Sequence, residues 1–161
     1  MRESLLRYKF GGLSQYAAGY APLLAAACAR LPLAEIDAVT WVPVSRRRRW
    51  SRGYDQAQLL ARAVARQLDK PLRATLRKAR HNRPQSAQET AEARRANVLG
   101  AYRALPGVAG GRYLLVDDIV TTGATLSEAA RTLLTAGAAA VYGAALAARE
   151  QRAAGELTEN R

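Results

Sequence analysis

The chain has little of what marks secreted, metal-stapled or membrane proteins. Its single cysteine, Cys28, cannot form an internal disulfide, and no Cys/His cluster has the spacing of a zinc site. We expect Cys28 to pack inside the fold and the only histidine, His81, to lie in a loop. No apolar run reaches the roughly 18 residues of a membrane-spanning helix, so we predict no membrane insertion and a cytoplasmic location.

The common nucleotide motifs GxxxxGK and GxGxxG are also absent. Acidic residues are outnumbered, because 13 Asp plus Glu stand against 25 Lys plus Arg, for a formal net charge of +12. This excess favours anionic partners such as phosphates, nucleic acid or acidic protein surfaces. The length of 161 residues fits about one domain. We predict a single domain over residues 1–148 and a polar C-terminal tail over 149–161.

Strand-like and helix-like segments alternate along the chain. Short runs rich in apolar and β-branched residues predict strands at 36–44, 72–76, 100–105, 113–116 and 138–147. Apolar periodicity and composition predict helices at 13–31, 54–68, 89–97 and from 126 to a cap at Gly137. The aperiodic stretch 77–88 predicts a mobile loop. The alternation predicts an α/β fold whose parallel sheet has helices on both faces and ligands at the carboxyl ends of its strands.

The segment 114–125, LLVDDIVTTGAT, carries the clearest chemistry. A predicted strand ends at the acid pair Asp117-Asp118, and two adjacent carboxylates can accept hydrogen bonds from vicinal ribose hydroxyls. The helix that begins near Thr125 favours a phosphate at its N-terminus, and Gly123 lets the backbone approach that phosphate. Each half alone is also typical of a solvated turn or a helix cap. Together they predict a site for a ribose 5-phosphate.

This segment resembles the motif that binds phosphoribosyl pyrophosphate (PRPP) in type I phosphoribosyltransferases. With VPVSRRRRWSRGYDQAQLLA and RKARHNRPQSAQETAEARRANVLGAY, it is similar to the competence-protein ComF branch of that superfamily, over residues 8–147. The resemblance implies a type I phosphoribosyltransferase-like parallel sheet with a flexible hood loop. ComF-like chains often begin with a four-cysteine zinc module. This sequence lacks the module, either because it is a fragment of a longer protein or because this member of the branch has none. Asp55 in RGYDQ stands where the branch has an amide, which leaves the role of Asp55 open.

The resemblance implies a role for each matching position. The acid pair Asp117 and Asp118 would hold the ribose hydroxyls and act in catalysis. The 5-phosphate loop would comprise Thr121, Thr122, Gly123, Ala124 and Thr125. The pyrophosphate loop would comprise Ser45, Arg46 and Arg47, with Arg52 as a further candidate, and the hood would contribute Gln85 and Arg94. Mg²⁺ is expected to be held mainly through PRPP rather than by protein side chains.

Three functions remain open at this point. A transferase would displace pyrophosphate from the ribose C1 with an acceptor that the sequence does not identify. A DNA-associated adaptor would use Arg46 to Arg49 with Trp50, and Arg77 to Arg83, to bind single-stranded DNA or DNA-processing proteins. The ComF resemblance implies such a link to DNA uptake, although an arginine run is also typical of a solvated surface. A regulator would sense PRPP with Mg²⁺ without transferring it, and a homodimer is among the assemblies that the sequence allows.

Overall fold

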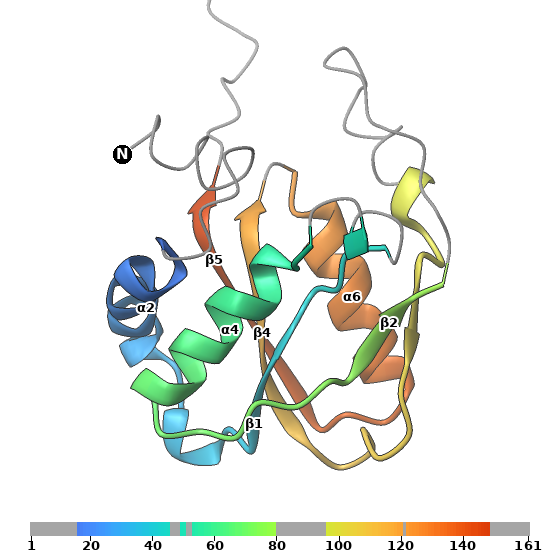
Figure 1. The fold of residues 1–161 in the computed structure, drawn as a ribbon. Helices are drawn as coiled ribbons and strands as arrows, with labels where there is room; N and C mark the ends of the chain where they lie inside the picture. Colours follow the sequence, from blue (N-terminus) through green and yellow to red (C-terminus); the bar gives the residue numbers. More distant parts are fainter. Residues whose placement is uncertain (1–15, 46–48, 51–52, 80–95, 121, 149–161) are drawn as a thin grey trace, which may run out of the picture.

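The core of the protein is a parallel β-sheet in a computed structural model that describes residues 16–45, 49–50, 53–79, 96–120 and 122–148 (Figure 1). The strand order is β1-β4-β5. These strands are β1 (Ala38–Trp41), β4 (Arg112–Val120) and β5 (Ala140–Ala148). An isolated parallel bridge joins Val39 of β1 to Leu72, so the sheet continues on the other side of β1. The predicted parallel α/β fold is confirmed.

Helices cover both faces of this sheet (Figure 1). They are α2 (Tyr16–Ala27), α4 (Gln56–Gln67) and α6 (Ala124–Thr135). The first two pack on one face and α6 packs on the other. The central strand β4 serves both faces because its side chains alternate: Leu114 and Val116 join the core with α4, and Tyr113 and Leu115 join the core with α6. A strand that is apolar on both faces is typical of a buried parallel sheet.

The helix α6 ends where the sequence predicts. Gly137 adopts a φ of 91°, in the left-handed region that glycine enters without strain. Its N–H donates to the Leu134 carbonyl at 3.0 Å, and the Ala138 N–H donates to the Leu133 carbonyl at 3.1 Å. This pair of bonds is the Schellman arrangement that satisfies the last carbonyls of a helix. The predicted cap at Gly137 is confirmed.

A second, antiparallel ribbon pairs β2 (Leu76–Lys78) with β3 (Tyr102–Ala104). The strand expected at 100–105 is therefore confirmed, whereas the prediction for 72–76 is wrong in its position. The chain makes only an isolated bridge to Val39 at Leu72, and residues 73–75 belong to no strand. The Thr75 hydroxyl shares a buried hydrogen bond of 2.6 Å with that of Thr40. The strand begins at Leu76 because its partner β3 lies there, so the predicted loop at 77–88 starts too early.

The segments that lead into β1 are short 3-10 turns, η1 (Cys28–Arg30) and η2 (Leu33–Glu35). The helix expected at 13–31 is observed as α2, which ends at Ala27. Of the helix expected at 89–97, only residues 96 and 97 are described, and they are helical together with residue 98. Within the described ranges, none of the helices is both long and apolar enough to cross a membrane.

Candidate functional site

The central strand β4 runs through the acid pair, whereas its neighbour β1 stops just before it. The pairing of β1 with β4 ends at Trp41 and Val116, and the Val42 N–H then donates to the Val116 carbonyl at 2.9 Å. β4 continues beside β5 as far as Val120. The sequence predicts that this strand ends at Val116, and this boundary is wrong because β4 pairs with β5 beyond the point where β1 leaves. From the acid pair onward, β4 therefore pairs with β5 but no longer with β1.

Both carboxylates of the pair are oriented by the backbone. Asp117 is 8% exposed and Asp118 is half-buried. The Asp118 N–H donates to Asp117 Oδ1 at 2.8 Å, and the Ile119 N–H donates to Asp118 Oδ1 at 2.8 Å. Hydrogen bonds from backbone N–H groups fix the orientation of a carboxylate. Each carboxylate is thus oriented as an acceptor at the end of the sheet.

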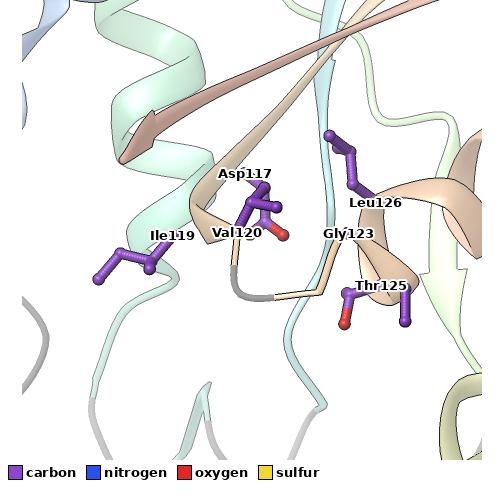
Figure 2. A pocket seen from close by; sticks show the side chains of 7 residues that line it. Asp117, Ile119, Val120, Gly123, Thr125 and Leu126 are labelled. Carbon is purple, nitrogen blue, oxygen red and sulfur yellow. The ribbon is translucent and has the colours of Figure 1, made fainter. Parts of the chain in front are cut away.

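A pocket lies between the end of β4 and the first turn of α6 (Figure 2). It is lined by Asp117, Ile119, Val120, Gly123, Ala124, Thr125 and Leu126. Gly123 caps α6 with a φ of 75°, a conformation that suits glycine, and the Ser127 N–H donates to its carbonyl at 2.8 Å. The Ala124 N–H lies 3.4 Å from Thr122 Oγ1. The N–H groups and the dipole of this first turn make the pocket favourable for an anion.

The segment between β1 and α4 reaches the same end of the sheet. Ser45 is buried, and its carbonyl accepts the Arg49 N–H at 2.9 Å. The Arg49 carbonyl in turn accepts the Gly53 N–H at 2.8 Å. Because β1 and β4 are parallel, this segment follows the end of β1 beside the end of β4. The structure therefore brings Ser45 and the acid pair to one edge.

Asp55 lies at the end of this segment, directly before α4, and binds backbone groups of both. Its carboxylate is 4% exposed and accepts the Val44 N–H at 3.0 Å and the Gln58 N–H at 3.2 Å. The second bond makes Asp55 the N-cap of α4. The sequence left the role of this residue open, although Asp followed by Gln three positions later is a capping pattern that predicts it. Asp55, the acidic residue that departs from the ComF pattern, thus holds the segment after β1 to the start of α4. We call a buried carboxylate that ties a backbone N–H to a helix in this way a clamp.

The electrostatics of Asp55 link the two segments. Burial raises the pKa of this carboxyl, while the bonds from Val44 and Gln58 and the charge of Arg49 act to lower it. The negative charge of Asp118 adds to the rise in this pKa. Of the acid pair, Asp118 is therefore the residue whose charge acts on Asp55.

A second buried carboxylate lies on α6, and the sequence analysis did not identify it. Glu128 is 6% exposed and accepts the Gly100 N–H at 2.8 Å, which ties the segment before β3 to the helix. Arg131 contacts both carboxylate oxygens at 2.8 Å. This hydrogen-bonded arginine lowers the pKa of Glu128. The only sequence signal is a Glu and an Arg three positions apart on a helix.

Several predicted site residues lie outside the described residues. They are Arg46, Arg47 and Arg52 of the basic segment, Thr121 of the phosphate loop, and Gln85 and Arg94 of the hood. His81, which is expected in a loop, lies outside them as well. Cys28 is described and is 2% exposed, and its burial raises the pKa of the thiol. Its predicted role in packing is confirmed. Among the described residues, no group of three or more His, Cys, Asp or Glu side chains gathers as a metal site would require.

The sequence of this chain matches that of known phosphoribosyl transferase domains. The phosphoribosyl transferase domain family matches residues 55–158. The chain is 36% identical over 107 residues to the DNA utilization protein YhgH of Escherichia coli strain K12, covering 65% of this chain and 46% of that protein. It is 36% identical over 101 residues to competence protein F of Haemophilus influenzae, covering 60% of this chain and 44% of that protein.

Competence protein ComFC of Bacillus subtilis strain 168 is 30% identical over 140 residues, covering 87% of this chain and 56% of that protein. The chain thus spans about half the length of these curated relatives.

Solved structures agree on the fold. The allosteric regulatory enzyme of purine biosynthesis superposes with a TM-score of 0.54 at 24% identity, over 81% of this chain and 25% of that chain. Phosphoribosylpyrophosphate synthetase from Mycobacterium smegmatis superposes with a TM-score of 0.50 at 20% identity, over 80% of this chain and 33% of that chain. The chain therefore belongs to the phosphoribosyl transferase domain family, with the ComF-type competence proteins among its relatives, as its motifs predict.

Proposed function

We propose that the chain binds PRPP with Mg²⁺ and transfers the 5-phosphoribosyl group to an acceptor, releasing pyrophosphate. The observation that carries this proposal is the pocket between the end of β4 and α6, which has the backbone-oriented carboxylate of Asp117 on one side and a helix N-terminus on the other, with Asp118 next along the strand. A ribose 5-phosphate has the matching groups, with vicinal hydroxyls at one end and a dianion at the other. Membership of the family supports the same ligand.

In this proposal the acid pair accepts hydrogen bonds from the ribose hydroxyls. Asp117 and Asp118 each use one oxygen to accept a backbone N–H, which aims the carboxylates before the ligand arrives. The 5-phosphate lies against the backbone from Thr122 to Thr125, with the Thr122 and Thr125 hydroxyls as further donors. Gly123 leaves open space in front of the backbone, since a Cβ there would meet only Ser127 Oγ at 4.0 Å.

The pyrophosphate is assigned to the segment after β1. Ser45 is at its start, and the sequence supplies Arg46, Arg47 and Arg52 as cations for the departing charge. Mg²⁺ prefers oxygen ligands, which the acid pair offers at this edge. As the family resemblance implies, we propose that the ion is held mainly through PRPP. When bound, it would neutralise phosphate charge.

Transfer forms a bond from the acceptor to the ribose C1 and breaks the bond from C1 to the pyrophosphate oxygen. The bonding electrons leave with pyrophosphate, and the acceptor loses its proton to solvent or to a nearby base. Such a reaction depends on positioning and on stabilising the leaving charge, which the two segments at one edge would provide. The names of the relatives, DNA utilization protein and competence protein, lead us to propose that this activity serves DNA uptake or use.

Calorimetric titration with PRPP, in the presence and absence of Mg²⁺, tests the site. The variant Asp117→Asn/Asp118→Asn keeps the oxygens that accept the two backbone N–H bonds but removes both charges, so the fold should persist. Asp69→Asn is the matched control, because Asp69 is exposed beyond the end of α4. We expect Mg²⁺-dependent binding by the wild type and the control, and none by the double variant.

Two results would overturn the assignment of the site: no binding by the folded wild type, or equal binding by the double variant. Turnover is tested separately, by measuring pyrophosphate release with a panel of nitrogen nucleophiles. Release that requires both an acceptor and the acid pair supports a transferase. Binding without release across the panel would remove the transferase activity from the proposal and leave a PRPP sensor.

A further inference from the structure

The outer strand β5 leaves one edge of the sheet without charge. It runs for nine residues, Ala140–Ala148, and contains neither a charged residue nor a proline. Within the described part of the chain it pairs with β4 alone. At the opposite side of the sheet, the bridge at Leu72 is followed by Arg73, and the ribbon there places Arg77 directly opposite Arg103. Proteins usually block a free strand edge with charges or prolines, and β5 has neither.

The helix above this edge is equally free of charge. α4 contacts β1 and β4, whereas α2 contacts α4 and β5, so α2 lies at the β5 side of its layer (Figure 1). No Lys, Arg, Asp or Glu occurs in α2, although these four residue types make up 24% of the chain. Leu23 of α2 is 58% exposed. A helix that is apolar on all sides is normally buried, so the outer side of α2 is suited to a contact.

We propose that a second copy of this chain covers both features, with β5 of one copy pairing antiparallel with β5 of the other. A two-fold axis perpendicular to the sheet relates the two strands, which then satisfy each other's free N–H and C=O groups. Such an axis keeps each face of the sheet on its own side. The same rotation therefore places α2 of one copy beside α2 of the other and covers the exposed Leu23.

The charge of the chain favours this occupant at this edge. A two-fold axis brings each residue at the contact close to its own copy, so like charges would face each other across it. A chain with a net charge of +12 therefore associates with itself most readily through an uncharged surface, which β5 and α2 provide. An acidic partner would instead be attracted to the charged surfaces elsewhere. The strand edge alone is a small contact, and α2 extends it towards the size of a stable interface.

This dimer leaves the two proposed PRPP sites independent. β4 and β5 are parallel within one copy, and the two β5 strands are antiparallel to each other in the proposed dimer. The carboxyl ends of the two sheets, each with its acid pair, then face opposite directions. The inference does not depend on the proposed function, and Asp117→Asn/Asp118→Asn should associate as the wild type does.

Sedimentation velocity over a series of protein concentrations tests the association. We expect the wild-type chain to shift from the mass of one chain to that of two as its concentration rises. Because both copies are cationic, added salt should screen their repulsion and lower the dimer Kd. A contact held by ion pairs or by bound nucleic acid would respond to salt in the opposite direction.

Two neighbouring proline substitutions locate the contact at the β5 edge. Successive N–H groups of a strand point to opposite sides, so one of Ala144 and Ala145 donates towards β4 and the other towards the free edge. Ala144→Pro and Ala145→Pro should therefore differ. The variant that loses a bond to β4 should melt at a lower temperature. The variant that loses only the outward donor should keep the wild-type circular dichroism and sediment as a single chain.

Leu23→Arg tests the contact at α2 and keeps the proposal testable if neither proline variant folds. It places a cation beside its own copy across the axis and should raise the dimer Kd about tenfold or more, less so at high salt. Leu99→Arg is the matched control, because Leu99 is 62% exposed and precedes Gly100, which is bonded to α6 on the opposite face. It adds the same charge and should leave the dimer unchanged.

Two results would overturn the proposal. A wild-type chain that remains a monomer over the whole concentration series would mean that β5 and α2 are not a contact between copies. A dimer that persists unchanged in both proline variants and in Leu23→Arg would mean that the copies meet through another face.

Discussion

Asp55 and Glu128 are two buried carboxylates with the same structural task on opposite faces of the sheet. Asp55 is 4% exposed and ties the Val44 amide to α4, while Glu128 is 6% exposed and ties the Gly100 amide to α6. Each bond joins a segment outside a helix to that helix. The two differ in what else surrounds the carboxylate. Glu128 has an arginine on both oxygens, whereas Asp55 has a second backbone N–H, from Gln58.

This difference moves the two pKa values in opposite directions. The hydrogen bond from Arg131 outweighs burial and lowers the pKa of Glu128. At Asp55, burial outweighs the backbone bonds and the charge of Arg49, and Asp118 adds to the rise in pKa. A buried carboxylate thus favours its charged form only when the surrounding groups compensate for the loss of hydration on burial. Asp55, the clamp beside the proposed PRPP site, is therefore the carboxylate whose charged form is disfavoured by burial.

The largest expected effect comes from removing the Asp55 clamp. Asp55→Ala deletes the N-cap of α4, worth about 1 kcal/mol, and leaves the Val44 N–H without its partner, at about 1–3 kcal/mol. We expect the free energy of unfolding to fall by about 3 kcal/mol, less whatever is gained by removing a buried charge. Urea denaturation followed by circular dichroism measures it.

Asp55→Asn serves as the control for that change, since one amide oxygen can still cap Gln58 while the NH₂ group faces the Val44 donor. Its loss should be clearly smaller than that of Asp55→Ala. Equal losses in the two variants, or a loss within 0.5 kcal/mol for Asp55→Ala (about the scatter of surface substitutions), would show that Asp55 is not a clamp.

A smaller effect is expected at the second clamp. Glu128→Ala removes the acceptor of the Gly100 N–H. A hydrogen bond to a charged group is worth about 1.5–3 kcal/mol. Because Gly100 is exposed to water, we expect the loss of unfolding free energy to lie near the lower end of this range. Hydrogen exchange of the Gly100 amide measures this bond directly. It should accelerate in Glu128→Ala and stay protected in Arg131→Ala, which removes the cation but keeps the acceptor. An unchanged Gly100 rate in Glu128→Ala contradicts the assignment.

The pH dependence of stability sharpens the contrast between the clamps. Asp55 has a pKa above its ordinary value of 3.8, so its contribution is fully present below that pH and is lost as pH rises through the folded pKa. Glu128 has a pKa below its ordinary value of 4.5, so its contribution is present above that pH and is lost as pH falls through the folded pKa. The difference in unfolding free energy between wild type and Asp55→Asn should therefore decrease as pH rises from about 4.

The corresponding difference for Glu128→Gln should decrease as pH falls below 4.5, the ordinary value for this carboxyl. Urea titrations at a series of pH values measure both differences. Slopes of the same sign for the two variants would mean that the local surroundings do not separate these carboxylates.

The sequence predicts those parts of this architecture that depend on local patterns. The alternating strands and helices, the cap at Gly137 and the position of the acid pair all follow from periodicity and turn chemistry within a few residues. The bond between Asp55 and Gln58 is also local, three positions along the chain. By contrast, Asp55 reaches Val44 across 11 residues and Glu128 reaches Gly100 across 28, so these clamps depend on how the chain folds back. The end of β4 escaped prediction for the same reason, since β5 determines it.

The smallest effect is expected at Glu35, a carboxylate that pairs with an arginine as Glu128 does but is exposed. Glu35 lies 3.7 Å from the Arg112 guanidinium, and both side chains are about half exposed, at 59% and 46%. Water screens such a pair, so Glu35→Ala should lower the free energy of unfolding by less than about 0.5 kcal/mol, and added salt should reduce even that. Urea denaturation at low and high ionic strength measures both quantities. A loss as large as that of Glu128→Ala would mean that burial is not what distinguishes the two clamps from a surface ion pair.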